Sequence, residues 1–201
     1  MFDKDAEDYL RYQAKNELRK RMRGVRNSIP ERALASRSEK IVERVLATPA
    51  YAKARSIGLF YPMEGRNEVD VRPIDLAARA AGKAVAYPFL RGPAEMALLC
   101  AEMSTLRERG SLFAEPPEDA PEVSADDGLV VIVPALAVDP TGQRVGYGKG
   151  FYDRLLERVV PPAFAIAVAY DFQVVAEVPR MDGDQPTNMV VTDLRTWVIE
   201  R

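Results

Sequence analysis

Apolar residues recur every three or four positions in four segments of the chain, which is the spacing of one face of an α-helix. These segments are 9–26, the stretch from "SIPE" to Thr48 and Pro49, the stretch from about Arg72 to near Gly82, and Phe151 to Val160. Ser28 is expected to cap the second helix and Glu31 to reach back to it, with Pro30 in the first turn.

Between these segments lie short apolar runs that predict β-strands. They are 55–61, "KAVAYPFL", "EMALLCAEM", 128–139, "AFAIAVAYDF", "NMVVTD" and "TWVIE". The run 128–139 is apolar without alternation, as in a strand that is buried on both faces of a parallel sheet. Strands that alternate with helices predict an α/β fold with a mostly parallel or mixed sheet.

The length of 201 residues suggests one domain, 1–201, with 1–8 as a flexible acidic tail. The proline-rich acidic stretch 107–127 is interpreted as a surface loop. A net charge of −2 gives no field that would attract nucleic acid or a membrane surface, and we expect neither as a partner. Without a long apolar run or a signal core, a cytoplasmic location is expected, and a monomer is the default.

The chain has no histidine, which removes the usual general base and almost all zinc chemistry. Any metal must take oxygen ligands, which favours Mg²⁺. The single cysteine, Cys100, excludes an internal disulfide, and its strand-like flanks favour a buried thiol over a nucleophile.

The segment "GQRVGYGKGFYDRLL", residues 142–156, holds four of the twelve glycines and follows the predicted buried strand. In open α/β sheets, ligands bind beyond the carboxyl ends of the strands, where a helix N-terminus attracts anions. Arg144 and Lys149 would pair with phosphate oxygens, and Asp153 in the first helical turn could hold Mg²⁺. A structural turn with Asp153 as a capping carboxylate is the alternative.

Basic residues recur every fourth position along the first predicted helix: Arg11, Lys15, Arg19 and Arg23. They border its apolar stripe. From the spacing alone, a solvated face is the favoured explanation of this row and a binding surface is the alternative.

The segment "VPALAVDPTGQRVGYGKGFYDRLL" resembles the signature of the 5-formyltetrahydrofolate cyclo-ligase family, also called 5,10-methenyltetrahydrofolate synthetase. "KNELRKRMR", "GLFYPMEGRNEVD" and "GDQPTNMVVTD" are similar to further family segments in the same order. The resemblance runs from about Lys15 to Asp193. It implies a Rossmann-like three-layer sandwich with helices on both faces.

The resemblance also implies a reaction: ATP- and Mg²⁺-dependent conversion of 5-formyltetrahydrofolate to 5,10-methenyltetrahydrofolate, with release of ADP and phosphate. It implies ATP contacts from Lys15, Arg19, Arg144, Val145, Gly146, Tyr147, Gly148, Lys149, Gly150, Phe151 and Tyr152. It implies folate contacts from Tyr61, Glu68, Tyr147, Lys149 and Phe151, Mg²⁺ ligands Asp153 and Asp184, and catalytic roles for Lys149 and Arg144.

Each assignment has a structural alternative. Tyr61 and Tyr152 could be core aromatics, and Met96 is expected in the core rather than in the pterin pocket. A relative that uses ATP on another substrate, or a nucleotide-binding module without catalysis, would keep the glycine segment.

Three positions depart from the family pattern: Gly183 replaces a common histidine, Val71 replaces a common threonine, and the stretch 62–68 is slightly long. They put the geometry of Asp184, one polar folate contact and the alignment of Glu68 in doubt.

Overall fold

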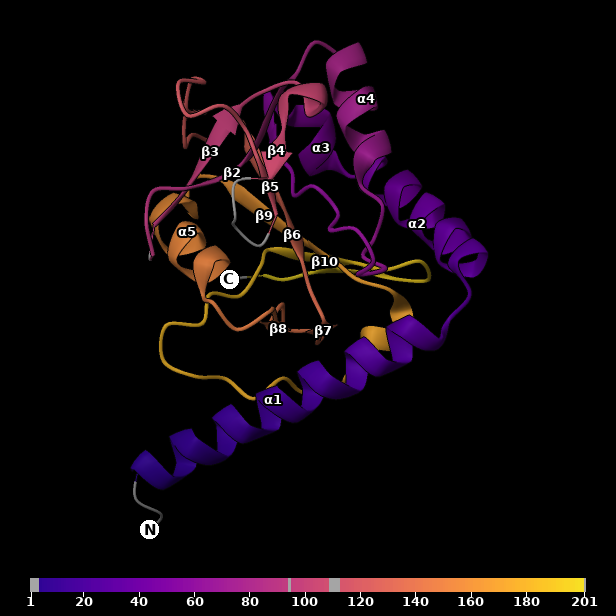
Figure 1. The fold of residues 1–201 in the computed structure, drawn as a ribbon, viewed down its shortest axis with the longest axis vertical. Coiled ribbons are helices and arrows are strands. Elements are labelled where there is room, and N and C mark those ends of the chain that lie inside the picture. The colour runs from indigo at the N-terminus through magenta and orange to yellow at the C-terminus, as the bar shows by residue number, and fades with distance from the viewer. Residues whose placement is uncertain (1–3, 94, 109–112, 201) are drawn as a thin grey trace.

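The computed structural model describes residues 4–93, 95–108 and 113–200, and a mixed seven-stranded sheet lies at its centre (Figure 1). The strand order is β11-β10-β9-β6-β1-β2-β3, and the pairs among β10, β9, β6, β1 and β2 are parallel. Edge strands β3 and β11 pair antiparallel. The strands are β1 Ser56–Gly58, β2 Ala84–Leu90, β3 Met96–Cys100, β6 Leu129–Pro134, β9 Phe164–Val168, β10 Met189–Val191 and β11 Thr196–Val198. The predicted α/β class and mixed sheet are confirmed.

Helices cover both faces of the sheet. Helices α2 Glu31–Leu46, α3 Pro49–Lys53 and α4 Arg72–Ala80 lie on one face, and α5 Phe151–Val159 lies on the other. Alternate residues of β6 serve the two layers: Val130 and Ile132 pack under α2 and α4, whereas Val131 and Val133 pack under α5. This period of two is the side-chain pattern of an extended strand, and it produces the three-layer sandwich that the resemblance implied.

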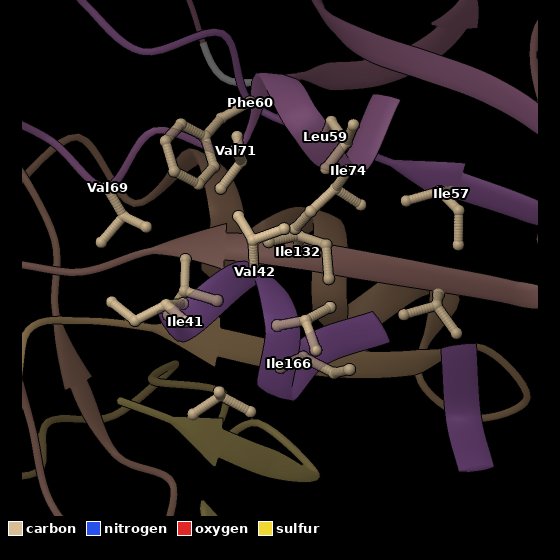
Figure 2. Close-up of a cluster of buried hydrophobic side chains, with 14 of the residues drawn as sticks. Ile41, Val42, Ile57, Leu59, Phe60, Val69, Val71, Ile74, Ile132 and Ile166 are labelled. Carbon is tan, nitrogen blue, oxygen red and sulfur yellow. The ribbon is translucent and has the colours of Figure 1, made fainter. Parts of the chain in front are cut away.

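The larger core lies under α2 and α4. Figure 2 shows Ile41 and Val42 of α2 directed toward strand residues such as Ile132 and Ile166. All four side chains are at most 6% exposed. Burial of this kind contributes roughly 25 cal/mol per Å² of apolar surface and holds the sheet rigid beneath the site.

Helix α1, Lys4–Ser28, crosses the end of the sheet where β7 Ala137–Val138 and β8 Arg144–Val145 form a small hairpin (Figure 1). Met22 packs there against Leu136, Ala137 and Val145. The N-terminal half of α1 extends away from the body of the molecule.

The start of α1 differs from the prediction. It begins at Lys4 rather than residue 9, so residues 4–8 of the expected acidic tail are helical, and residues 1–3 lie outside the described residues. Ser28 does not cap α2. Its hydroxyl bonds back to the Val25 carbonyl at 2.8 Å, as serine in a helix can. Pro30 is the residue at the N-cap position.

The run 128–139 is not one strand. It divides into β6 and β7 because the Gln173 amide donates to the carbonyls of Ala135 and Leu136, at 3.2 and 2.8 Å. The predicted strand 55–61 is shorter than expected, at Ser56–Gly58. The predicted loop 107–127 contains strands β4 Arg107–Glu108 and β5 Ala114–Glu115, and residues 109–112 lie outside the described residues.

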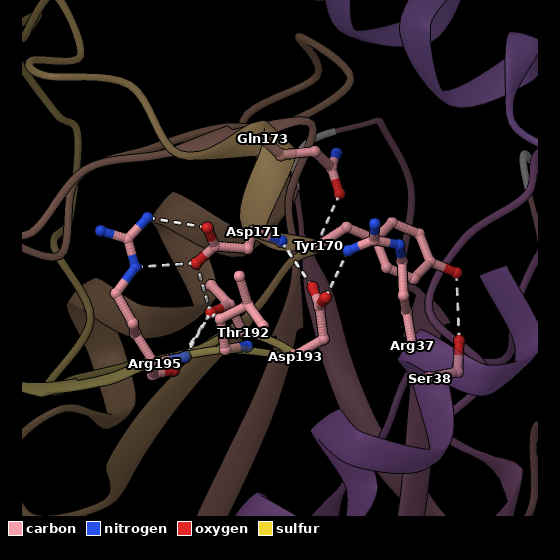
Figure 3. A network of polar contacts seen from close by, with 9 residues as sticks. Arg37, Ser38, Tyr170, Asp171, Gln173, Thr192, Asp193 and Arg195 are labelled. Atoms are coloured by element: carbon pink, nitrogen blue, oxygen red, sulfur yellow. Dashed lines mark hydrogen bonds and ion pairs between the residues drawn. The ribbon is translucent and has the colours of Figure 1, made fainter. Parts of the chain in front are cut away.

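A polar network ties the ends of β9 and β10 to α2 (Figure 3). The Asp193 carboxylate accepts from Arg37 and from the Asp171 amide, and Asp171 in turn pairs with Arg195 at 2.7 Å. Beside it, Ser38 contacts the Tyr170 hydroxyl at 3.1 Å. The carboxyl ends of these strands are therefore fixed to the helix layer.

Two minor expectations hold. Met96 is 1% exposed and belongs to the core. Cys100 is half-buried, and burial raises the pKa of its thiol, which is unfavourable for a nucleophile.

Among the described residues, no helix combines the length and apolar character needed to cross a membrane.

Candidate active site

The glycine loop, residues 146–150, connects β8 to α5 at the carboxyl end of β6 (Figure 1). Gly148 and Gly150 have positive φ angles of 92° and 66°, and Gly150 is the N-cap of α5. Arg19 of α1 donates from Nε to the Gly146 carbonyl at 2.9 Å. Burial lowers the pKa of the Arg19 guanidinium. The loop is thus fixed to a cation of α1 and leads into a helix N-terminus, an arrangement that suits an anion.

Arg144 does not project from the loop. It is 7% exposed, and its guanidinium donates to the Gln185 carbonyl and to Asp153 Oδ1, the latter at 2.8 Å. Burial lowers the pKa of this guanidinium. Asp153 also accepts from the Gln185 amide at 3.2 Å. The donors of Arg144 thus join Asp153 to the C-terminal segment, and its contact with phosphate stays a prediction.

Asp184 lies in that same segment and meets α1. Its Oδ2 forms an ion pair with Lys15, which is 5% exposed, and accepts from the Met181 amide at 2.7 Å. Lys15 and Arg19 of α1 thus lie near Asp184, and the buried Arg144 lies near both Asp184 and Asp153. Each carboxylate keeps one oxygen without a hydrogen bond to the described residues.

Glu68 approaches the glycine loop from the other side. Its Oε1 accepts from the Tyr147 hydroxyl and its Oε2 from the Met63 amide, both at 2.8 Å. The Tyr147 hydroxyl also accepts from Arg26 of α1 at 2.8 Å. Burial raises the pKa of Glu68, and burial next to Glu68 raises the pKa of Tyr147 to about 12.

The remaining predicted contacts differ in exposure. Lys149 is exposed, and its side chain makes no hydrogen bond or ion pair with the described residues. Phe151 is half-buried under the Arg154 guanidinium, 5.3 Å from the ring centroid. Tyr152 packs between the two core layers and burial raises its pKa, while Tyr61 packs against the larger core. Val145 is fully buried, so its side chain cannot meet a ligand.

The departures from the family pattern have structural explanations. Val71 is 1% exposed and packs in the core, so it would not contact a ligand. Gly183 is exposed with a φ of +87°, a conformation that favours glycine over a histidine. An open groove of about 820 Å³ beside it is lined by Arg11, Glu177, Pro179, Arg180, Met181, Asp182 and Gly183.

The described residues contain no group of three or more acidic or cysteine side chains that could hold a metal ion. Mg²⁺ is typically held by one or two carboxylates together with substrate phosphates and water. The free oxygens of Asp153 and Asp184 fit that pattern, and neither residue could serve as part of an all-protein cage.

One arginine of the site, Arg26, was not predicted from the sequence. The basic row was read at a spacing of four, whereas Arg26 follows Arg23 by three and Arg19 by seven, on the same helical face. A search at helical spacing of three, four and seven would have found it. Arg23 was seen, but its position over the Tyr147 ring, 5.3 Å from the centroid, was not foreseeable.

The fold and this geometry define a class: an α/β protein in which a glycine loop, cations from a crossing helix and two carboxylates lie at the carboxyl end of the sheet. The sequence profile of the 5-formyltetrahydrofolate cyclo-ligase family matches residues 11–193. The chain belongs to that family.

Individual relatives agree with this assignment. The 5-formyltetrahydrofolate cyclo-ligase of Mycolicibacterium smegmatis is 30% identical over 94% of this chain and 98% of its own length. The enzyme of the same name from Escherichia coli K12 is 30% identical over 79% and 89%. The solved structure of Aquifex aeolicus 5,10-methenyltetrahydrofolate synthetase has a TM-score of 0.80 at 30% identity and covers 93% of both chains.

Proposed function

We propose that this site converts 5-formyltetrahydrofolate to 5,10-methenyltetrahydrofolate at the expense of ATP, the reaction for which its family is named. The observation that carries the proposal is the bond between the Tyr147 hydroxyl and Glu68. It joins the glycine loop, a nucleotide-type feature, to Glu68, a half-buried carboxylate that precedes α4 in the chain. A nucleotide and a second, nitrogen-rich substrate would therefore meet at this loop.

The nucleotide phosphates would lie between Lys15, Arg19, Lys149 and the N-terminus of α5. Lys149 is exposed and unpaired toward the described residues, so it can follow the γ-phosphoryl group through transfer. Lys15 is already paired with Asp184, and phosphate would compete for its charge. The groove beside Gly183 gives the nucleotide room within the usual range of ligand pockets.

Asp153 and Asp184 would hold Mg²⁺ through their free oxygens. The ion supplies charge neutralisation for the phosphates when bound. Arg144 and the Gln185 amide fix the orientation of Asp153, and Lys15 and the Met181 amide fix that of Asp184. Their fixed orientation lowers the reorganisation that ion and phosphate binding would otherwise require.

The chemistry asks for no histidine and no protein nucleophile. The formyl oxygen attacks the γ-phosphorus and ADP leaves. N10 then adds to the formyl carbon, the carbon–oxygen bond breaks with phosphate as leaving group, and N10 loses its proton. The protein aligns the two substrates and stabilises charge on the transferred group, which is most of what phosphoryl transfer needs. Glu68 would accept hydrogen bonds from N–H groups of the folate.

The test is near-ultraviolet absorbance of the protein with 5-formyltetrahydrofolate, ATP and Mg²⁺. The conjugated product absorbs where the substrate does not, so a rising band that needs both ATP and Mg²⁺ is expected.

Lys149→Ala should lower kcat by about 10²-fold, which is the usual effect of losing one donor that stabilises charge in the transition state, without loss of stability. Lys40→Ala, at an exposed lysine of α2, should match the wild type.

If the wild type binds ATP by calorimetry but forms no such band, the folate reaction is refuted. The same loop would then serve another acceptor or a binding function.

A further inference from the structure

We infer that Arg26 and Tyr147 are positioning residues for Glu68, and that the Tyr147 hydroxyl holds this carboxylate in the orientation in which it binds the folate. The inference rests on the proposed function, because it assigns a role toward the folate side of the same site. It gives Arg26 a role and gives Tyr147 one beyond ligand contact.

The direction of the hydrogen bonds is fixed by chemistry. A guanidinium can only donate and an ionised carboxylate can only accept. The Tyr147 hydroxyl therefore accepts from Arg26 and directs its single proton to Glu68 Oε1, each at 2.8 Å. The phenol thus has one orientation, and it specifies which Glu68 oxygen is engaged.

Arg26 is buried without a carboxylate in direct contact. It is 3% exposed, its guanidinium donates to the Tyr147 hydroxyl, and its Nε has no hydrogen-bond partner among the described residues. An arginine buried in this way is costly to folding unless another group gains from its charge. The group stabilised by Arg26 is Glu68. Burial raises the pKa of Glu68, and the positive charge of Arg26 offsets part of that rise.

The Tyr147 ring cannot drift. Arg23 lies over it at 5.3 Å, and its edge packs against the cluster formed by Met22, Leu136, Ala137, Val145 and Val178. The hydroxyl is thereby fixed relative to α1 and β8. Because Tyr147 belongs to the glycine loop, its hydrogen bond joins that loop to Glu68.

The backbone around Glu68 is fixed too. The Tyr170 hydroxyl donates to the Glu68 carbonyl at 3.0 Å, and Ser38 joins Tyr170 to the Asp70 amide at 3.1 Å. Asn67 has a φ of +53°, an uncommon value for a residue other than glycine. With the backbone fixed, the side-chain angle of Glu68 depends on Tyr147 and the Met63 amide.

The remaining capacity of Glu68 is what the ligand would use. A carboxylate offers about four acceptor directions, and two are occupied. The other two suit a ligand with paired N–H donors. Without the Tyr147 bond, the carboxylate could rotate about its last torsion and lose that alignment.

The test compares Tyr147→Phe with the wild type by steady-state kinetics. The variant keeps the ring and its packing and loses only the hydroxyl. We expect KM for 5-formyltetrahydrofolate to rise at least tenfold, and KM for ATP to change by less than about twofold. Tyr87→Phe is the matched control: it also removes a buried hydroxyl that donates to a carboxylate, Asp75, outside the site, and should leave both KM values unchanged.

The pH profile separates positioning from general damage. The charged or titratable groups that face Glu68 are Arg26 of α1, Arg66 of its own loop, Tyr147 and Tyr152 of the glycine loop and α5, and Tyr170 after β9. Tyr147→Phe and Arg26→Gln each remove a group that favours ionised Glu68. Both should move the acid limb of kcat/KM for the folate to higher pH.

A double-mutant cycle decides the route of the effect. If Tyr147 acts through Glu68, adding Tyr147→Phe to Glu68→Gln should change KM for the folate by less than about twofold. If the effects of Tyr147→Phe and Glu68→Gln on KM for the folate are fully additive, the inference is wrong. It is also wrong if the wild type is active and Tyr147→Phe changes neither KM for the folate nor the acid limb. Either outcome would leave the proposed function standing. A wild type with no product would remove both the proposed function and this inference.

Discussion

Single glycines of segment 142–150 serve different purposes. Gly142 has a φ of +84°, and a Cβ there would lie 2.5 Å from the Thr187 carbonyl oxygen. Gly148 and Gly150 also have positive φ, but a Cβ would meet the far ends of Arg19 and Arg154. A Cβ at Gly146 would meet open space. Gly142 is thus required by chain packing, and the glycine loop proper begins at Gly146.

Gly142→Ala should therefore destabilise the protein by about 1–3 kcal/mol, since the new methyl group meets backbone and the φ value is strained. Urea unfolding measures the change. The control is Gly24→Ala in α1, where a Cβ has no neighbour within 4 Å, and a gain of about 0.5–1 kcal/mol is expected. Equal stability of Gly142→Ala and the wild type would contradict the prediction.

Glu68, the carboxylate proposed to bind the folate, lowers the stability of the folded protein at neutral pH. Burial raises its folded-state pKa. The unfolded chain therefore ionises Glu68 first as pH rises above roughly 4, and folding stability falls until the folded pKa is passed. Glu68→Gln should thus match the wild type near pH 4 and exceed its stability at pH 7, while losing affinity for the folate. Thermal unfolding of both proteins at the two pH values measures this. The prediction is wrong if the stability of the variant minus that of the wild type is smaller at pH 7 than at pH 4.

At the scale of elements, α4 is fastened to β2 by a buried polar contact. Asp75 of α4 is 1% exposed and accepts from the Tyr87 hydroxyl at 2.6 Å and from Arg79 at 2.8 Å. Arg79 also reaches Glu102 at 2.6 Å. The sequence predicted the bounds of α4 well because its periodicity is local, whereas nothing in the sequence indicated this contact across the sheet.

Asp75→Ala should cost about 3 kcal/mol or more, because it leaves the Tyr87 hydroxyl and part of the Arg79 charge buried without their partner. Leu76→Ala, at a neighbouring side chain that is 66% exposed, should change stability by less than about 0.5 kcal/mol. Chemical denaturation of both variants gives the comparison. A similar small loss in both would show that the contact contributes little.

The whole molecule has several carboxylates that are stabilised by arginine. Hydrogen bonds from Arg195 lower the pKa of Asp171, and those from Arg72 lower the pKa of Asp70. A depressed folded-state pKa contributes stability that is present above the unfolded pKa and is lost as pH falls toward the folded value. The first pair joins the segment after β9 to the β10–β11 turn and the second lies at the start of α4, so acid acts at two separate places in the fold.

The contribution of these pairs to the free energy of unfolding should therefore stay level from neutral pH to about pH 5 and be lost below about pH 4, and Glu68→Gln removes the opposing contribution of Glu68 from the measurement. Urea titrations at a series of pH values measure this. Arg195→Gln should flatten part of the fall, because it removes the largest cause of the lowered pKa of Asp171. A stability curve that is flat to pH 2 would contradict the prediction.

Local patterns in the sequence predicted the α/β class, most of the helices and strands, and the segments that form the candidate site. Periods of two and about 3.6 residues depend on neighbours along the chain, so they indicate α4, α5 and the buried strands directly. The glycine string with Lys149 and Asp153, and the basic row with Lys15 and Arg19, are likewise contiguous signals. Their resemblance to a known family placed them at one site.

The tertiary structure decided what depends on contacts between distant segments. It turned Arg144 inward to Asp153, divided the run 128–139 through the amide of Gln173, and placed Val71 in the core. It also brought Arg26 to Glu68 through Tyr147, residues that lie on three separate elements. Hydrogen bonds of side chains follow distance in space, and a linear pattern carries no record of such distances until the chain has folded.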